Sequence, residues 1–168
     1  MNNKMIQNFE IQNFRCFEKT RISEFCRINL IGGKNNSGKT ALLESLYLSN
    51  SPSVNSVMKL RHFRGEDLEF IKALPERAWD NFFFNQKRTE PILIISEYGD
   101  VFHKLELICD DSVEQFITSV TEDKEQTDET TDLRTLLSNK KYSRSALHLK
   151  WTSSDEKEMA SSMIAHSS

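Results

Sequence analysis

Three patterns in the amino-acid sequence predict an α/β fold. The nearly continuous apolar segment from Cys26 to Ile31 is typical of a strand that is buried on both faces. Apolar residues then recur at helical spacing from Lys39 to Leu48, which predicts an amphipathic helix. Two β-type runs, 92–95 and 101–108, flank a glycine-containing turn at 97–100 and predict a β-hairpin. Together they indicate a strand–helix unit combined with antiparallel strands.

The remaining elements follow from their own periodicity. Residues 6–17 alternate between apolar and polar side chains, which predicts a strand with one buried face. The spacing is helical but loose over 54–84, where Pro75 interrupts the second of two short helices. A last strand is expected at 146–151, followed by a turn into 158–164. No repeat of fixed period is present.

Composition divides the chain into three parts. Residues 1–109 form the predicted main lobe, which contains the strand–helix unit and the hairpin. Residues 110–133 are acidic and rich in Thr and Glu, as expected for a solvated connection. Residues 134–168 are predicted to continue the lobe with β structure and to stop early.

Bulk composition fits a soluble protein with no global preference for an anionic partner. Apolar residues make up 38% and charged residues 28% of the 168 residues, and the net charge is -3. No apolar run approaches about 20 residues, and the N-terminus lacks the apolar core of a secretory signal. We therefore expect a cytoplasmic protein without a membrane span. The three cysteines and four histidines show no ligand spacing, which argues against a metal site made of protein side chains alone.

The loop between the predicted strand and helix carries the strongest chemical signal. Residues 33–40, Gly-Lys-Asn-Asn-Ser-Gly-Lys-Thr, fill every fixed position of the phosphate-binding pattern G-x-x-x-x-G-K-[ST]. The glycines permit a tight turn, so that backbone N–H groups and the helix N-terminus can surround a phosphate. Lys39 is expected to bridge the β- and γ-phosphates as the candidate catalytic residue, and Thr40 to bind Mg²⁺ together with ATP. The predicted nucleotide contacts are Gly33, Asn35, Asn36, Ser37, Gly38, Lys39, Thr40 and Ala41.

Hydrolysis also needs an acidic residue at the end of a second buried strand. The nearest candidates are Glu97, which follows the apolar run 92–95, and Asp110, which ends the run 105–109. Both lie in the predicted hairpin, so neither resembles the end of a central parallel strand. The sequence thus predicts triphosphate binding more directly than it predicts turnover.

Two segments carry a family resemblance. Residues 11–17, Ile-Gln-Asn-Phe-Arg-Cys-Phe, and residues 28–44, which end in Asn-Asn-Ser-Gly-Lys-Thr-Ala-Leu-Leu-Glu, resemble the N-terminal portion of SMC/RecF-type AAA ATPases. Among these, the OLD-like (overcoming lysogenisation defect) phage-defence ATPases are the most similar. The resemblance is strong over residues 6–48 and weaker at the hairpin.

This resemblance implies a P-loop NTPase fold of the ABC type, in which a mixed sheet carries the loop beside an antiparallel lobe. It places Arg15 close to the nucleotide, and it implies a glutamine that senses Mg²⁺, for which Gln86 and Gln115 are equal candidates. The signature motif and acidic strand of the family are not recognisable here. The implied partners are ATP, a second ATPase head in a homodimer or higher oligomer, DNA, and a nuclease domain or partner.

Two basic groups bear on the DNA interpretation. Lys59, Arg61, His62 and Arg64 form one, and Lys140, Lys141 and Arg144 form the other. Each could neutralise phosphates, although such a run of charges is more often only a solvated surface.

Three functions therefore remain open from the sequence. The first is an ATP-binding half of an ATPase head in DNA repair or phage defence, where ATP-dependent dimerisation gates DNA processing. The second is a non-catalytic regulatory module that scaffolds a full-length partner. The third is a small-molecule kinase, against which stand the hairpin and the lack of an arginine-rich lid.

Overall fold

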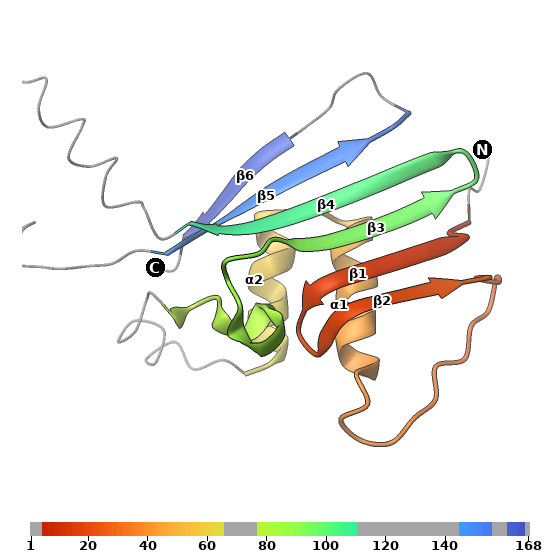
Figure 1. Cartoon of the computed structure of the whole chain (residues 1–168), viewed down its shortest axis with the longest axis horizontal. Coiled ribbons are helices and arrows are strands. Elements are labelled where there is room, and N and C mark those ends of the chain that lie inside the picture. The colour runs from red at the N-terminus through yellow and green to blue at the C-terminus, as the bar shows by residue number, and fades with distance from the viewer. Residues whose placement is uncertain (1–4, 66–76, 111–144, 156–160, 167–168) are drawn as a thin grey trace, which may run out of the picture.

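The computed structural model describes residues 5–65, 77–110, 145–155 and 161–166. Within them a six-stranded sheet runs in the order β2-β1-β3-β4-β5-β6, and every pairing is antiparallel. Figure 1 shows the strands side by side. Their bounds are β1 (Asn8–Phe14), β2 (Phe17–Ser23), β3 (Ile92–Tyr98), β4 (Val101–Asp110), β5 (Ala146–Ser153) and β6 (Ser161–His166).

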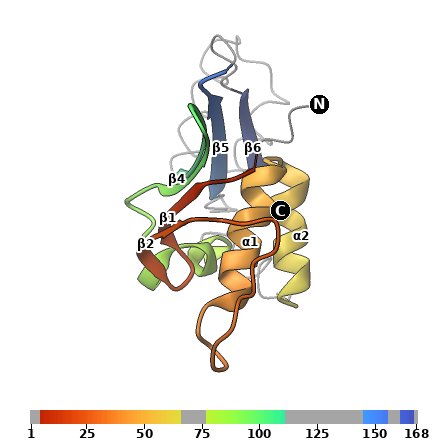
Figure 2. The same ribbon diagram turned by 90° about the vertical axis from the view of Figure 1, so that its right-hand side faces the viewer.

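Two α-helices, α1 (Lys39–Asn50) and α2 (Val54–Phe63), cover one face of the sheet, as Figure 2 shows from the side. The hydroxyl of Ser53 caps α2 by accepting a hydrogen bond from the Ser56 N–H at 3.1 Å. Two short 3₁₀ helices, η2 (Asp80–Phe82) and η3 (Phe84–Gln86), precede β3. In the described parts of the chain, no helix has the length and apolar character needed to cross a bilayer.

The core lies between the sheet and the two helices. Alternate residues of the central strands face it, and the register aligns Ile11 of β1 with Ile94 of β3 and Leu105 of β4. Burial of this one face follows from the period-two pattern of the strands. The largest fully buried side chains are Trp79, Phe9, Phe14, Phe82, Ile11, Leu48, Leu60, Ile92, Ile94, Leu105, Leu107 and Leu147.

Several predicted elements are confirmed. The helix expected from Lys39 to Leu48 is α1, and the hairpin expected at 92–108 is formed by β3 and β4. The α/β fold class with an antiparallel lobe is confirmed as well. The acidic connection lies almost entirely outside the described residues, and the domain boundaries stay a prediction.

Of two predictions about the N-terminal region, one is confirmed except for its end, and the other is wrong. The strand with one buried face expected over 6–17 is β1, but it ends at Phe14, because the chain turns at Arg15 and Cys16 and returns as β2. The buried strand expected at 26–31 is not formed, and this segment leaves the sheet as an extended loop (Figure 1). Ile28 and Leu30 are 90% and 98% exposed. A strand buried on both faces needs neighbouring strands and covering layers, and the described residues provide neither for this segment.

Candidate nucleotide-binding site

The loop predicted to bind phosphate lies directly before α1. The helix begins at Lys39, and Gly38 caps it in the left-handed conformation, with φ 88°. The unpaired N–H groups and the positive end of the helix dipole are therefore located at the loop. The Lys39 ammonium donates to the carbonyl oxygens of Gly33 at 2.8 Å and Lys34 at 2.6 Å, so its side chain lies against the loop backbone.

The β1–β2 turn packs closely against this loop. A Cβ atom on Gly38 would lie 2.9 Å from Sγ of Cys16 and 3.1 Å from the ring of Phe17. Both distances are shorter than ordinary van der Waals contacts, and the left-handed backbone is a second reason for glycine here. The turn therefore supports the loop directly.

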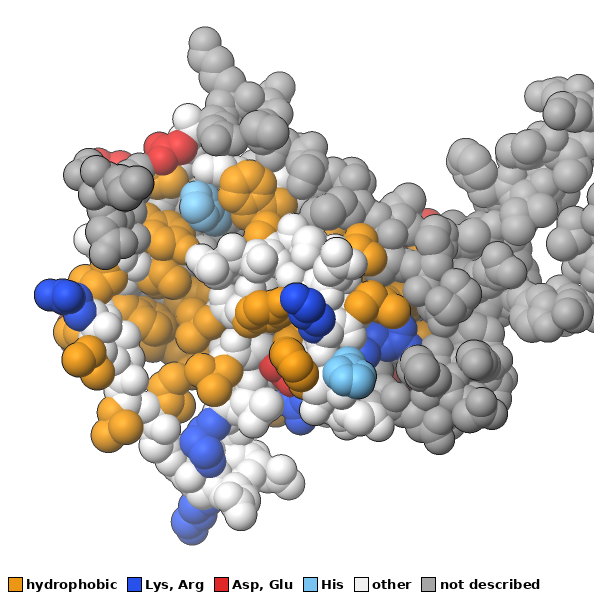
Figure 3. Space-filling model, turned by 180° about the vertical axis from the view of Figure 1, so that it is seen from behind, with side chains coloured by type: hydrophobic (Ala, Val, Ile, Leu, Met, Phe, Trp, Pro, Cys, Tyr) orange, Lys and Arg blue, Asp and Glu red, His pale blue; other side chains and the backbone are white. Residues whose placement is uncertain are grey.

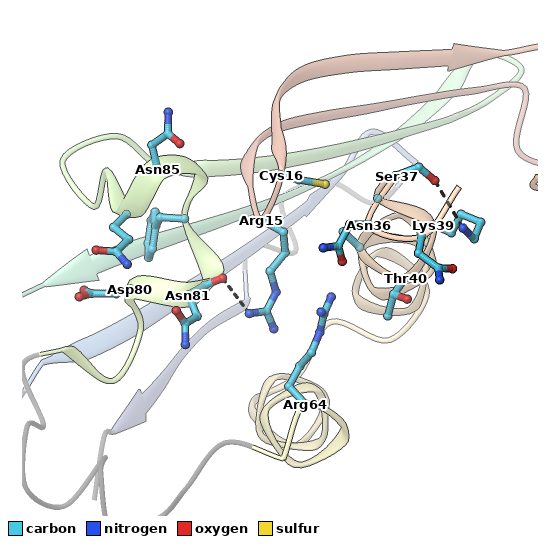
Figure 4. A pocket seen from close by; sticks show the side chains of 15 residues that line it. Arg15, Cys16, Asn36, Ser37, Lys39, Thr40, Arg64, Asp80, Asn81 and Asn85 are labelled. Carbon is cyan, nitrogen blue, oxygen red and sulfur yellow. Dashed lines mark hydrogen bonds between the residues drawn. The ribbon is translucent and has the colours of Figure 1, made fainter. Parts of the chain in front are cut away.

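A cavity of about 720 Å³ lies beside the loop, and Figure 4 shows the side chains around it. Its volume is within the range of small-molecule sites, roughly 300–1,000 Å³. Four parts of the chain form the wall: the β1–β2 turn, the loop with the start of α1, the residue after α2, and the segment 80–86. Cationic side chains from three of these parts, Arg15, Lys39 and Arg64, give it the charge that an anionic ligand requires.

The two arginines of this set share one buried carboxylate. Glu44 on α1 is 5% exposed and accepts hydrogen bonds from Nε of Arg15 at 3.1 Å and from Nε and Nη2 of Arg64 at 2.6 and 3.1 Å. Arg15 also donates to the carbonyl oxygen of Asn81 at 2.7 Å and lies 4.2 Å from the ring centre of Phe82. In Figure 4, Arg15 lies between Asn81 and the phosphate loop, and the Arg64 side chain points toward Arg15.

The wall opposite the loop has an unusual backbone. Asn85 and Gln86 adopt φ angles of 49° and 59°, a region that residues other than glycine rarely occupy. Both line the cavity, and such strain is commonly found at functional sites. Asp80, on the same wall, is held by Arg77 at 2.9 Å and Arg88 at 3.2 Å.

Most of the residues predicted for the site lie together. Arg15 and residues 35–41 all line the cavity, whereas Gly33 contributes a carbonyl oxygen to Lys39 from outside the wall. Of the two glutamine candidates, Gln86 lines the cavity and Gln115 lies outside the described residues. Sequence reasoning missed Arg64 as a site residue, because only the fold brings the end of α2 to the loop.

The acidic candidates lie elsewhere. Glu97 accepts hydrogen bonds from Asn8 at 2.6 Å and Arg21 at 3.3 Å, and Asp110 pairs with His148 at 3.5 Å. Neither carboxylate lines the cavity. Nor does the described part of the chain hold a group of three or more His, Cys, Asp or Glu side chains arranged for a metal ion.

The first basic group does not form one continuous surface. Arg61 is 5% exposed and stacks 4.7 Å from the ring centre of Trp79, and Arg64 pairs with Glu44. These two side chains therefore serve internal contacts, while Lys59 and His62 remain exposed. The second group, residues 140–144, lies outside the described residues.

Comparison with known proteins assigns the family. The model of the AAA ATPase domain matches residues 5–165, so the chain belongs to this family. Part of the chain is similar to RecF proteins. It is 35% identical over 75 residues to the DNA replication and repair protein RecF of Agathobacter rectalis, across 44% of this chain and 21% of that protein.

Two further relatives also match over part of their length. The chain is 51% identical over 43 residues to an ATP/GTP phosphatase of Helicobacter pylori, across 26% of this chain and 12% of the relative. It is 41% identical over 97 residues to an uncharacterised protein of Methanocaldococcus jannaschii, across 51% of this chain and 39% of the relative. The chain thus spans between 12% and 39% of these relatives. No solved structure matches it.

Proposed function

We propose that this chain is the ATP-binding half of an SMC/RecF-type ATPase head, with an OLD-like ATPase as the nearest model. One observation carries the proposal: the loop before α1, the start of that helix and Arg15 converge on one cationic cavity. A triphosphate fits this chemistry, because backbone N–H groups, Lys39 and the helix N-terminus all favour an anion. The proposed contacts are the predicted residues, together with Arg64.

Magnesium would be held with the nucleotide. The Thr40 hydroxyl lines the cavity beside Lys39 and can act as one oxygen ligand, while phosphate oxygens and water supply the others. Asp80 is the nearest acidic alternative on the wall, but Arg77 and Arg88 already engage its carboxylate. Bound Mg²⁺ would neutralise charge on the phosphates.

The proposed biological role is ATP-dependent pairing of two heads that gates a DNA-processing activity, in DNA repair or phage defence. The similarity to RecF, a DNA replication and repair protein, supports a link to repair. The proposal extends to a cytoplasmic protein with contact to DNA and to a nuclease domain or partner, both inferred from the family resemblance.

A non-catalytic regulatory module is the second candidate, and a specific observation favours it. Neither Glu97 nor Asp110 lines the cavity, and the Asp80 carboxylate, which does, is engaged by Arg77 and Arg88, so the described residues offer no uncommitted carboxylate there for hydrolysis. Under the first proposal, that group comes from the remainder of a complete head. Under the second, the chain binds nucleotide without turnover and scaffolds a full-length partner.

Binding and turnover of ATP by the wild type and Lys39→Ala test the proposal. We expect Lys39→Ala to weaken Mg²⁺-ATP binding by at least tenfold in titration calorimetry, because the phosphates lose their mobile positive charge. Lys34→Ala is the matched control, since it removes the same charge from the same loop at a side chain that does not line the cavity.

Equal affinity of the wild type and Lys39→Ala would overturn the nucleotide site. Turnover above that of Lys39→Ala would favour a complete catalytic centre over the non-catalytic module.

A further inference from the structure

Glu44 links α1 to the two arginines at the cavity. It lies on the same helix whose first residues form the phosphate loop, and its side chain is 6% exposed. A buried carboxylate is stable only when it is paired and hydrogen-bonded. Here its partners come from two distant segments, the β1–β2 turn and the residue after α2.

The hydrogen bonds fix how the two guanidinium groups lie. Arg64 places Nε and Nη2 on the two carboxylate oxygens, which is a bidentate pairing with a defined plane. Arg15 places Nε on Glu44 and Nη1 on the Asn81 carbonyl oxygen. Both arginines also line the cavity, and the Arg64 side chain is 39% exposed, so a ligand phosphate can reach it.

We propose that Glu44 is a positioning residue that directs Arg15 and Arg64 toward the phosphates of the bound nucleotide. This inference rests on the proposed function and adds two positioned arginines to the phosphate contacts of the same site. The loop and Lys39 surround the phosphates from α1, and the two arginines approach them from the β1–β2 turn and from the end of α2. Glu44 links the two groups of phosphate contacts, because it lies on α1, which follows the loop directly, and binds both arginines.

The sign of the effect separates positioning from simple electrostatics. Glu44 is negative, so its replacement by glutamine makes the cavity more positive and, by Coulomb attraction alone, would strengthen the binding of ATP. Loss of positioning has the opposite effect, because long arginine side chains that are free to rotate lose entropy when they bind a phosphate. Weaker binding in Glu44→Gln therefore supports positioning specifically.

The test measures Mg²⁺-ATP affinity by titration calorimetry for the full chain and for Glu44→Gln. We expect affinity to fall about tenfold. Glu10→Gln is the matched control: Glu10 also pairs with two cations, Lys19 and Arg21, and has a side chain that is 18% exposed, but it does not line the cavity. Its affinity should stay within twofold of the wild type. Unchanged or tighter binding in Glu44→Gln would overturn the inference.

Two further measurements keep the outcomes distinct. Thermal unfolding without nucleotide reports whether Glu44→Gln is folded; if it is not, Arg64→Lys carries the test, since it keeps the charge and loses the bidentate geometry. Affinity equal to the wild type in that variant would again overturn the inference. A wild type whose ATP binding does not depend on Lys39 would overturn the proposed function, whereas Lys39-dependent binding with full affinity in Glu44→Gln would overturn only the role of Glu44.

Discussion

Gly38 lies where the phosphate loop, the start of α1 and the β1–β2 turn meet. Its left-handed backbone allows the loop to enter the helix, and its missing side chain allows Cys16 and Phe17 to approach. A glycine that satisfies both conditions cannot be replaced by a small side chain without moving one of its neighbours. The glycine of the motif is therefore explained by tertiary contacts as well as by phosphate binding.

Gly38→Ala should weaken ATP binding by at least tenfold and lower the free energy of unfolding by about 1–3 kcal/mol, the range for one strained residue. The reasons are the unfavourable φ of 88° and the short contact to Cys16. Urea unfolding and titration calorimetry measure the two effects. Gly32→Ala is the control, because nothing lies within 4 Å of a Cβ added there. Equal behaviour of the two variants would contradict this account.

Residues of the loop could be predicted because their chemistry depends on local spacing. Lys39 and Thr40 are fixed by their distance from Gly38, and that pattern is visible without any fold. Glu44 and Arg64 could not be predicted, since their pairing joins α1 to the end of α2. In the sequence, Arg64 is only one member of a basic run.

At the scale of elements, the β1–β2 hairpin holds two walls of the cavity together. Arg15 at its turn reaches Asn81 on one wall and Glu44 beside the other. The amide of Asn13 donates to the carbonyl oxygens of Lys87 at 3.1 Å and Glu90 at 2.8 Å, which fixes the connection into β3. The short motif from Asn13 to Phe17 thus contacts both the phosphate loop and the segment 81–90 that precedes β3.

Trp79 joins three elements in a similar way. Its side chain is fully buried, its indole N–H donates to the Ser145 carbonyl oxygen at 3.1 Å just before β5, and Arg61 of α2 stacks on its ring. Trp79→Phe leaves that carbonyl oxygen without its donor and removes buried volume. We expect it to lower the free energy of unfolding by about 2 kcal/mol.

Trp151→Phe is the matched control for this prediction. Trp151 is half-buried on β5, and its indole N–H has no hydrogen-bond partner in the described part of the chain. Its replacement should therefore cost less than about 1 kcal/mol. Chemical denaturation of both variants provides the comparison, and similar losses at the two positions would show that the Ser145 hydrogen bond contributes little.

Elements whose partners are near in sequence could be predicted from the sequence. The hairpin of β3 and β4 closes at Gly99, and α1 follows directly from the spacing of its apolar residues. The segment 26–31 has the composition of a buried strand, yet burial depends on neighbouring strands that can be distant in the sequence. Local pattern alone could not supply them.

At the scale of the whole molecule, the loop 26–31 and α1 expose apolar side chains on the side of the helices. Figure 3 shows hydrophobic side chains gathered on this side. Besides Ile28 and Leu30, Leu43 of α1 is 57% exposed. The chain spans less than two fifths of these relatives, and exposed apolar side chains of this kind are typical of a surface that contacts other protein.

The double substitution Ile28→Ser and Leu30→Ser tests that view of the molecule. In the chain alone, the free energy of unfolding should change by no more than about 0.5 kcal/mol, because both side chains are already in solvent. Sedimentation velocity should show less self-association than for the wild type, since exposed apolar surface drives contact between copies. Ile94→Ser, at a fully buried position of β3, should instead cost about 3 kcal/mol or more. A loss above about 1 kcal/mol in the double variant would mean that the side chains of residues 26–31 pack within this chain.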